Sequence, residues 1–116
     1  MSEEKALRKF MREVRTGLYG VLIMHALRVK GEMHGYGLRQ VIEEMTSGEL
    51  RPVESTVYET LKKLSKVGIL KSEWRVGGPA LPRKYYSLTE VGVKVYESLR
   101  PEVVKLLSAV LKVLEG

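Results

Sequence analysis

Apolar residues recur every three or four positions over most of this chain, which is the spacing of helices that bury one face. Residues 3–15 follow this pattern with charged residues between the apolar ones. A second apolar segment runs from residue 18 to residue 27, and Gly17 and Gly20 interrupt the pattern between the two. The spacing leaves open whether these residues form one bent helix or two.

Two shorter helices are predicted in the middle of the chain. The first follows a turn at residues 31–35 and is expected to stop at Gly48. Pro52 ends the connecting loop, and the second helix is expected to stop at Gly68. The core face of this second helix is predicted to carry Val57, Leu61, Leu64 and Val67.

A hairpin is predicted after the helix pair. From Ile69 to Val76 the apolar residues alternate with a period of two, which is typical of a strand. Residues 77–79 interrupt it, and residues 83–88 return as its partner. The tip, residues 77–82, is either a turn only or a segment that comes close to a nucleic-acid backbone.

A long apolar helix is predicted at the C-terminal end, with Thr89 as its N-cap and Glu90 in its first turn. Pro101 predicts a kink or a restart of this helix near residues 99–101. The apolar face is too broad for one small core to cover, so we expect a homodimer. The predicted dimerisation residues are Tyr96, Leu99, Val103, Leu106, Leu107, Val110, Leu111 and Leu114.

These elements predict an α+β fold, mainly helical with a small β-hairpin. Their order is that of a winged helix-turn-helix followed by a long C-terminal dimerisation helix. We expect residues 1–88 to form the N-terminal helix and the DNA-binding domain, and residues 89–116 the dimerisation helix. A chain of 116 residues is long enough for one core.

Charge indicates a polyanionic partner. The net charge is +6, and the segment from Arg51 to Lys84 holds eight basic and three acidic residues. The chain has no Cys, no N-terminal signal pattern and no apolar run long enough for a membrane span. We therefore expect a cytoplasmic protein that does not enter a membrane.

The second helix of the pair is the predicted reader of double-stranded DNA. If it lies in the major groove, the hydroxyls of Ser55, Thr56 and Tyr58 are candidates for base edges or nearby phosphates. The alternative is that Ser55 and Thr56 cap the helix while Tyr58 packs on a neighbour. The basic candidates for phosphate contacts are Lys62, Lys63, Arg83 and Lys84.

Other functions have fewer residues to support them. His25 and His34 are the only histidines, and the chain lacks both Cys and Asp, so neither a catalytic triad nor a metal or cofactor site is predicted. We therefore expect no enzyme. The remaining alternatives are a winged helix that docks another protein and a non-specific DNA-binding chromatin protein.

Four motifs carry a family resemblance, and the stretch that contains them covers roughly residues 17–96. Together they resemble the PadR family of winged-helix transcriptional regulators, in its shorter form with one C-terminal helix. The motifs are His34-Gly35-Tyr36-Gly37, Ser55-Thr56-Val57-Tyr58, Gly68-Ile69-Leu70 and the run from Arg83 through Tyr85, Tyr86 and Thr89 to Gly92.

The resemblance implies a dimeric repressor that binds an inverted repeat near a promoter. It implies that the C-terminal helix pairs with the N-terminal helix of the other subunit, and it adds Tyr36 to the DNA-binding candidates. In some members a phenolic acid or a hydrophobic cation releases the DNA. The chain departs from the family in having Val53 before the second helix, where a small polar cap is usual, and in lacking a basic residue at the wing tip.

An effector pocket is predicted at the dimer interface, for a small hydrophobic or phenolic molecule. Tyr19 and Tyr96 are its candidate lining residues, and the alternative is that both are ordinary packing residues. The multidrug-sensing relatives use a Trp in the C-terminal helix, whereas the single Trp of this chain, Trp74, belongs to the predicted wing.

Overall fold

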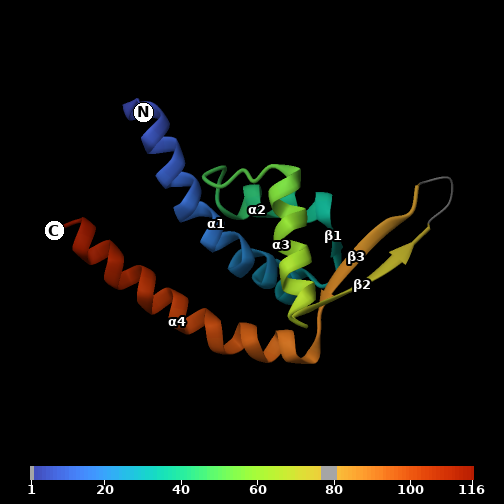
Figure 1. The fold of residues 1–116 in the computed structure, drawn as a ribbon. Coiled ribbons are helices and arrows are strands. Elements are labelled where there is room, and N and C mark those ends of the chain that lie inside the picture. Colours follow the sequence, from blue (N-terminus) through green and yellow to red (C-terminus); the bar gives the residue numbers. More distant parts are fainter. Residues whose placement is uncertain (1, 77–80) are drawn as a thin grey trace.

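The computed structural model describes residues 2–76 and 81–116, and these residues form four helices and a three-stranded antiparallel sheet (Figure 1). The predicted α+β winged-helix fold is confirmed. The elements, in chain order, are α1 (Glu3–Lys30), β1 (Met33–His34), α2 (Gly35–Met45), α3 (Glu54–Lys66), β2 (Leu70–Arg75), β3 (Arg83–Leu88) and α4 (Glu90–Leu114).

The N-terminal region is one continuous helix, α1, and not two helices separated at Gly17 and Gly20. Ser2 caps α1 by accepting a hydrogen bond from the backbone of Lys5. The helix continues through Gly17 and Gly20, and a Cβ added at Gly20 would lie 3.9 Å from the side chain of Thr60. That distance is an ordinary contact, so α3 packs beside this part of α1 with room for a methyl group at position 20.

Left-handed glycines mark the ends of the helix pair. After α2 ends at Met45, Gly48 has a φ of 79° and its N–H donates to the carbonyl of Glu43. After α3, Gly68 has a φ of 80°. The predicted place of Val67 on the core face is wrong: α3 ends one residue earlier, and Val67 is 64% exposed.

The sheet contains one strand more than the predicted hairpin. β2 and β3 pair in the register Leu70 to Leu88, and β1 adds to the other edge of β3. A strand as short as Met33–His34 has no alternation that a sequence pattern could reveal. Of the predicted wing tip, residues 77–80 lie outside the described residues. We call the β2–β3 hairpin the wing.

The core forms where α1, α2 and α3 meet the sheet and the start of α4. Thr89 caps α4 as predicted, accepting from the N–H of Gly92 at 2.9 Å. A Cβ at Gly92 would overlap the carbonyl oxygen of Ile69, so only glycine allows this close approach. The buried residues are Tyr19, Ile23, Met24, Ala26, Leu27, Leu38, Val41, Ile42, Val57, Leu61, Leu64, Leu70, Tyr86 and Tyr96.

Of the two outcomes predicted for Pro101, a kink or a restart, the restart does not occur, because α4 is one helix from Glu90 to Leu114. A proline removes a single backbone hydrogen bond and bends a helix without necessarily ending it. Figure 1 shows that the axis of α4 changes direction along its length. The first turns of α4 belong to the core, because Tyr96 is buried there. The division at residue 88 into a DNA-binding domain and a dimerisation helix stays a prediction.

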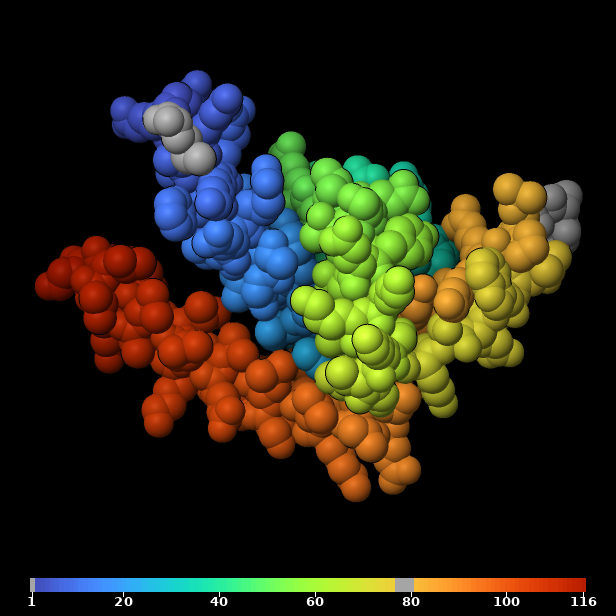
Figure 2. All heavy atoms as spheres, in the orientation of Figure 1, coloured from blue at the N-terminus to red at the C-terminus, as the bar shows by residue number. Residues whose placement is uncertain are grey.

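Two helical arms extend from this core on the same side of the molecule (Figure 2). They are the first half of α1 and the second half of α4, and both carry exposed apolar side chains. No helix in the described part of the chain is long and apolar enough to cross a membrane. The exposed apolar residues of the arms are Leu7, Phe10, Met11 and Val14 on α1, and Val104, Leu106, Leu107, Val110, Leu111, Val113 and Leu114 on α4.

Candidate nucleic-acid interface

Helix α3 presents a polar face to solvent because its apolar residues fall on one side. Val57, Leu61 and Leu64 are buried, while Ser55, Glu59, Lys62 and Lys66 are exposed on the opposite side. We call these four exposed residues the reading face. The spacing of its buried residues thus turns the helix so that hydroxyl, carboxylate and ammonium groups point outward together.

The first turn of α3 has free backbone donors. Its N-cap is Val53, which makes no side-chain cap hydrogen bond, so the alternative that Ser55 or Thr56 caps the helix is not what the structure contains. The first intrahelical bond is donated by the N–H of Val57 to the carbonyl of Val53. The amides of residues 54–56 precede it, and they form the positive end of the helix dipole.

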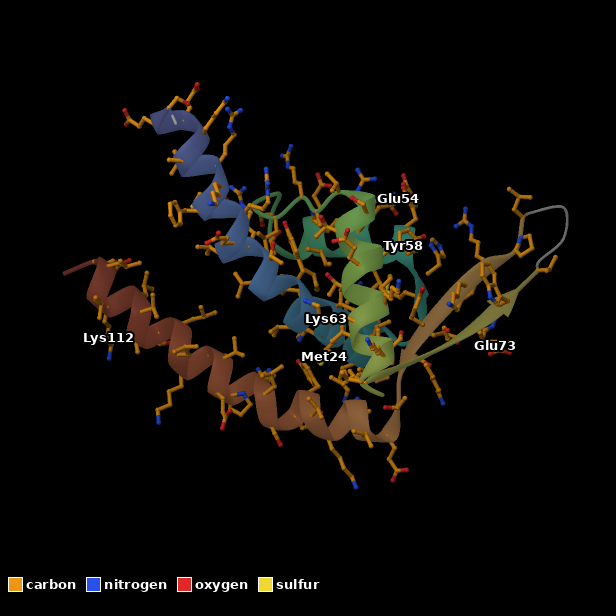
Figure 3. All side chains as sticks on the ribbon, in the orientation of Figure 1. Met24, Glu54, Tyr58, Lys63, Glu73 and Lys112 are labelled. Atoms are coloured by element: carbon orange, nitrogen blue, oxygen red, sulfur yellow. The ribbon has the colours of Figure 1, made fainter. Side chains whose placement is uncertain are left out.

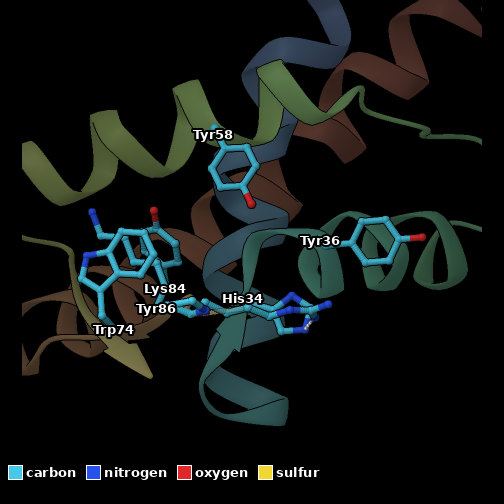
Figure 4. A pocket seen from close by; sticks show the side chains of 8 residues that line it. His34, Tyr36, Tyr58, Trp74, Lys84 and Tyr86 are labelled. Carbon is cyan, nitrogen blue, oxygen red and sulfur yellow. Dashed lines mark hydrogen bonds between the residues drawn. The ribbon is translucent and has the colours of Figure 1, made fainter. Parts of the chain in front are cut away.

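An open cleft of about 580 Å³ separates the first turns of α2 and α3 from the wing (Figure 4). The ring of Tyr58 reaches toward the start of α2, and a Cβ added at Gly35 would lie 2.7 Å from its Cζ. Figure 3 shows Tyr58 on the side of α3 that faces the wing. The cleft is lined by His34, Tyr36, Tyr58, Trp74, Pro82, Arg83, Lys84 and Tyr86.

His34 joins the start of α2 to the wing. Its Nδ1 lies 3.1 Å from the N–H of Gly37 and caps α2, and its Nε2 lies 2.9 Å from Nη1 of Arg83. A neutral imidazole has one acceptor nitrogen, so it accepts a hydrogen bond from only one of these two donors. Burial lowers the pKa of His34, and the charge of Arg83 lowers it further. Arg83 thus lies beside a neutral ring, with further N–H donors on its guanidinium.

Aromatic rings order the basic side chains of the wing. Nζ of Lys84 lies 5.9 Å from the ring centroid of Trp74 and 5.8 Å from that of Tyr86. Burial raises the pKa of Tyr86, and the neighbouring Tyr58 raises it further, so the phenol remains neutral. Lys84 therefore projects into the cleft between two aromatic faces.

Arg75 differs from the other basic residues of the wing. Its guanidinium forms a two-pronged ion pair with Glu32, and it lies 5.0 Å from the ring centroid of Tyr85. Hydrogen bonding to Glu32 raises the pKa of Arg75. The positive charge of Arg75 is thus largely matched within the protein, whereas Lys84 has no such carboxylate among the described residues.

The structure brings together some of the predicted DNA-binding residues and separates others. Tyr36, Tyr58, Arg83 and Lys84 line the cleft. Ser55, Lys62 and Lys63 lie on the exposed surface of α3. Thr56 lines a different hollow, between α3 and α1.

Sequence reasoning did not assign His34, Trp74 or Tyr86 to this site. His34 comes directly before the Gly35-Tyr36-Gly37 helix start, and a side chain at that position is a candidate cap. The sequence therefore contained a signal that places His34 at the start of this helix. The pairing of Trp74 with Lys84 across the wing follows from the register of β2 and β3, which periodicity alone does not determine.

The two tyrosines predicted to share an effector pocket lie apart. Tyr96 lines an apolar hollow of about 430 Å³, whereas Tyr19 lines the hollow between α1 and α3. The hydroxyl of Tyr96 lies 2.5 Å from Nδ1 of His25, and Tyr96 is buried in the core. Leu99 is partly buried against the same core, so neither residue belongs to the exposed apolar arm. The hollow at Tyr96 is also lined by Val21, Leu22, His25, Met45, Thr46, Arg100, Val103 and Val104.

No metal site accompanies these surfaces in residues 2–76 and 81–116, because no three His, Cys, Asp or Glu side chains come close enough together to bind an ion.

Comparison with known proteins shows similarity to one family of transcriptional regulators. Residues 14–98 match the transcriptional regulator PadR-like family. A PadR family transcriptional regulator from Eggerthella lenta is similar over 97% of this chain and 96% of its own, with 28% identity and a TM-score of 0.78. A Streptococcus mutans protein is similar over 87% of this chain and 90% of its own, with 31% identity and a TM-score of 0.72.

A further similar structure contains nucleic acid. Bacillus subtilis PadR, solved in complex with operator DNA, is 29% identical over 69% of this chain and 45% of its own, with a TM-score of 0.62. No curated protein matches the chain.

Proposed function

The chain belongs to the PadR-like family of transcriptional regulators, and we propose that it is a dimeric repressor that binds an inverted repeat near a promoter. As a member of this family it is a DNA-binding regulator and not an enzyme. The observation that carries the finer proposal is the exposed polar face of α3 beside the basic, aromatic cleft of the wing. The similar Bacillus subtilis PadR was solved in complex with operator DNA, which supports DNA as the partner of this surface.

In this proposal α3 lies in the major groove. Ser55 and Tyr58 contact base edges or adjacent phosphates, and Lys62 and Lys63 neutralise phosphates along the groove. The free amides of residues 54–56 attract a further phosphate to the N-terminal end of α3. Thr56 lies on the edge of α3 that faces α1, so we propose that its hydroxyl contacts the DNA backbone and not a base.

The wing binds the DNA backbone next to the groove that α3 enters. Arg83 and Lys84 supply the charge, and Tyr36 closes the cleft from the side of α2. A guanidinium can bind one phosphate through two N–H donors, while an ammonium acts as a point charge. Trp74 and Tyr86 position Lys84 before DNA arrives, and Arg83 lies beside the ring of His34.

The apolar arms support the dimer. Seven apolar residues of α4 beyond residue 103 are more than 40% exposed, and Leu106 is 63% exposed. Such a stripe is costly in water, and pairing with the apolar face of α1 from a second subunit would bury both. The symmetric dimer would place its two α3 helices about 34 Å apart, one DNA turn, which matches an inverted repeat.

The effector belongs, in this proposal, to the hollow at Tyr96. It is mostly apolar, it adjoins the dimer arm through Val103 and Val104, and it offers Arg100 and the His25–Tyr96 pair as polar contacts. A small hydrophobic or phenolic molecule fits that combination. A panel of phenolic acids and hydrophobic cations that changes neither melting temperature nor DNA affinity would remove this part of the proposal.

Titration of the purified protein against its own upstream DNA and a scrambled duplex tests the function. We expect saturable preference for the upstream fragment and a steep loss of affinity with salt. Tyr58→Ala and Lys62→Ala should both weaken binding while the dimer stays intact. Unchanged affinity in both variants would refute α3 as the DNA-reading helix, and absence of DNA binding at any salt would favour a protein-docking winged helix.

A further inference from the structure

A second basic surface lies on α1, outside the helix pair and the wing. Arg8, Arg12 and Arg15 are all exposed, and together with Arg51 they line a hollow of about 390 Å³ at the N-terminal end of α3. We call Arg8, Arg12 and Arg15 the arginine row. The rest of the hollow is lined by Thr16, Tyr19, Pro52, Val53, Thr56 and Glu59.

The spacing of the arginine row places its members on one face of α1. Positions i, i+4 and i+7 align on a helix with 3.6 residues per turn. The apolar residues of the arm, among them Leu7 and Val14, fall about a third of a turn away. The arginine row is therefore separate from the apolar face that the dimer would bury.

The same face of α1 changes character at the edge of the core. Further along the helix it carries Tyr19, Ile23 and Ala26, all of which are buried. Toward the N-terminus α1 extends past the core (Figure 2). There, arginines replace the apolar residues on the side next to α3. The sequence thus supplies positive charge where the helix leaves the protein interior.

The charge of the arginine row, unlike that of Arg51, is not matched by a nearby carboxylate. Arg51 lies 3.6 Å from Glu43 and donates to the carbonyl of Gly48. Within the described residues, no carboxylate lies within 4.0 Å of a guanidinium nitrogen of the arginine row. Glu59 is the single acidic residue against four arginines in the lining. An anion would find several unpaired donors there.

We propose that the arginine row and Arg51 form a second phosphate-binding surface, which holds the DNA backbone beside the N-terminal end of α3. The inference rests on the proposed DNA-binding function and extends it. Guanidinium groups bind phosphate oxygens through paired donors. The first turn of α3, which has free amides at residues 54–56, borders the same hollow through Val53 and Thr56. These contacts touch no base edge, so they add affinity and salt dependence without adding sequence preference.

The test compares the salt dependence of binding in Arg12→Gln/Arg15→Gln and in the wild type. Each lost phosphate contact should lower the slope of log K against log salt by about 0.9, so the double variant should lose about 1.8. Affinity for upstream and scrambled duplexes should fall by the same factor. A second variant, Arg12→Lys/Arg15→Lys, should keep the slope and lose only part of the affinity, because lysine keeps the charge without the paired donors.

Lys105→Gln/Lys112→Gln is the matched control. It removes the same charge from the polar side of α4, and Figure 3 shows Lys112 at the far end of that helix from α3. An equal loss of slope in the control and the arginine variant would overturn the inference while leaving DNA binding intact. The inference would also be overturned if Arg12→Gln/Arg15→Gln kept the wild-type salt slope but formed a weaker dimer in sedimentation. The arginine row would then face the second subunit and not the DNA. Wild-type protein that binds no DNA would overturn the proposed function itself and the inference with it.

Discussion

The ring of Tyr58 on α3 lies directly over the backbone of Gly35, the first residue of α2. A Cβ at position 35 would lie 2.7 Å from Cζ and 2.9 Å from the hydroxyl of Tyr58. The side chain that we assign to DNA contact is therefore held by the helix that precedes it in the chain. The absence of a side chain at Gly35 determines where the Tyr58 hydroxyl lies.

Gly35→Ala should displace Tyr58 and weaken DNA binding without unfolding the protein. The clash is with the far end of a side chain, so the ring can move while the core stays packed. We expect roughly a tenfold loss of affinity, about 1.4 kcal/mol, measured by anisotropy of a labelled duplex.

Gly37→Ala is the control for this prediction. It lies in the same turn, and its added Cβ would come no closer than 3.4 Å to His34 or Met33. Equal affinities of the two variants for DNA would contradict the role given to Tyr58.

Removal of the carboxylate on the reading face should strengthen DNA binding. Glu59 is exposed near the middle of that face, where it repels phosphates. Two unit charges at contact in water interact by about 1 kcal/mol, so Glu59→Gln should raise affinity for a scrambled duplex roughly fivefold at low salt. Glu102→Gln on α4 is the control and should have little effect. An affinity for DNA that falls in Glu59→Gln would instead mean that the carboxylate accepts a hydrogen bond from a base.

Leu106→Glu should split the dimer. The substitution places a charge on the apolar stripe of α4, where a partner would bury it. We expect the dimer Kd to rise roughly a hundredfold, about 2.8 kcal/mol, in sedimentation equilibrium. Operator affinity should fall as a consequence, because each monomer holds one α3. Lys112→Glu, on the opposite side of α4, is the control and should leave the mass of the dimer unchanged. Equal dissociation of both variants would show that the apolar stripe of α4 is not the interface.

Acid should destabilise the protein through His34. Its pKa in the folded state lies below the usual 6.5, so the unfolded chain takes up the proton first as the pH falls. The contribution of His34 to stability is therefore complete above about pH 6.5 and is lost as the pH falls from there through the folded-state pKa.

The variant His34→Asn isolates this effect. Asparagine can still accept the N–H of Gly37 as an N-cap but does not titrate. The melting temperature of the wild type should fall more between about pH 7 and pH 5 than that of His34→Asn. Parallel melting curves for the two proteins would show that His34 does not couple to folding.

Periodicity predicted the helices well, because burial of one face leaves a repeating signal. Val57, Leu61 and Leu64 were placed on the core face of α3 from their spacing, and the structure buries all three. Thr89 was identified as a cap from its residue type and position. Val67 followed the same spacing but falls after the end of α3, where the spacing no longer describes the chain.

Contacts between distant segments could not be read from spacing. The pairing of His34 with Arg83 and the burial of Tyr96 against His25 join residues far apart in the chain. The basic surface on α1 is hidden in the charge total for another reason. Residues 1–30 contain seven basic and three acidic residues. The acidic region around α2 offsets most of this excess, so the charge of the segment from Arg51 to Lys84 alone nearly equals the net charge of the chain.

Amide hydrogen exchange with and without the upstream duplex tests the central claim most directly, that α3 and the wing bind DNA. The amides of residues 54–56 have no intrahelical acceptor, so they should exchange quickly in the free protein. We predict that bound DNA slows them, while residues 104–114 exchange as they do in the free dimer. Bound DNA that leaves the amides of residues 54–56 unchanged and protects a different surface would contradict the account.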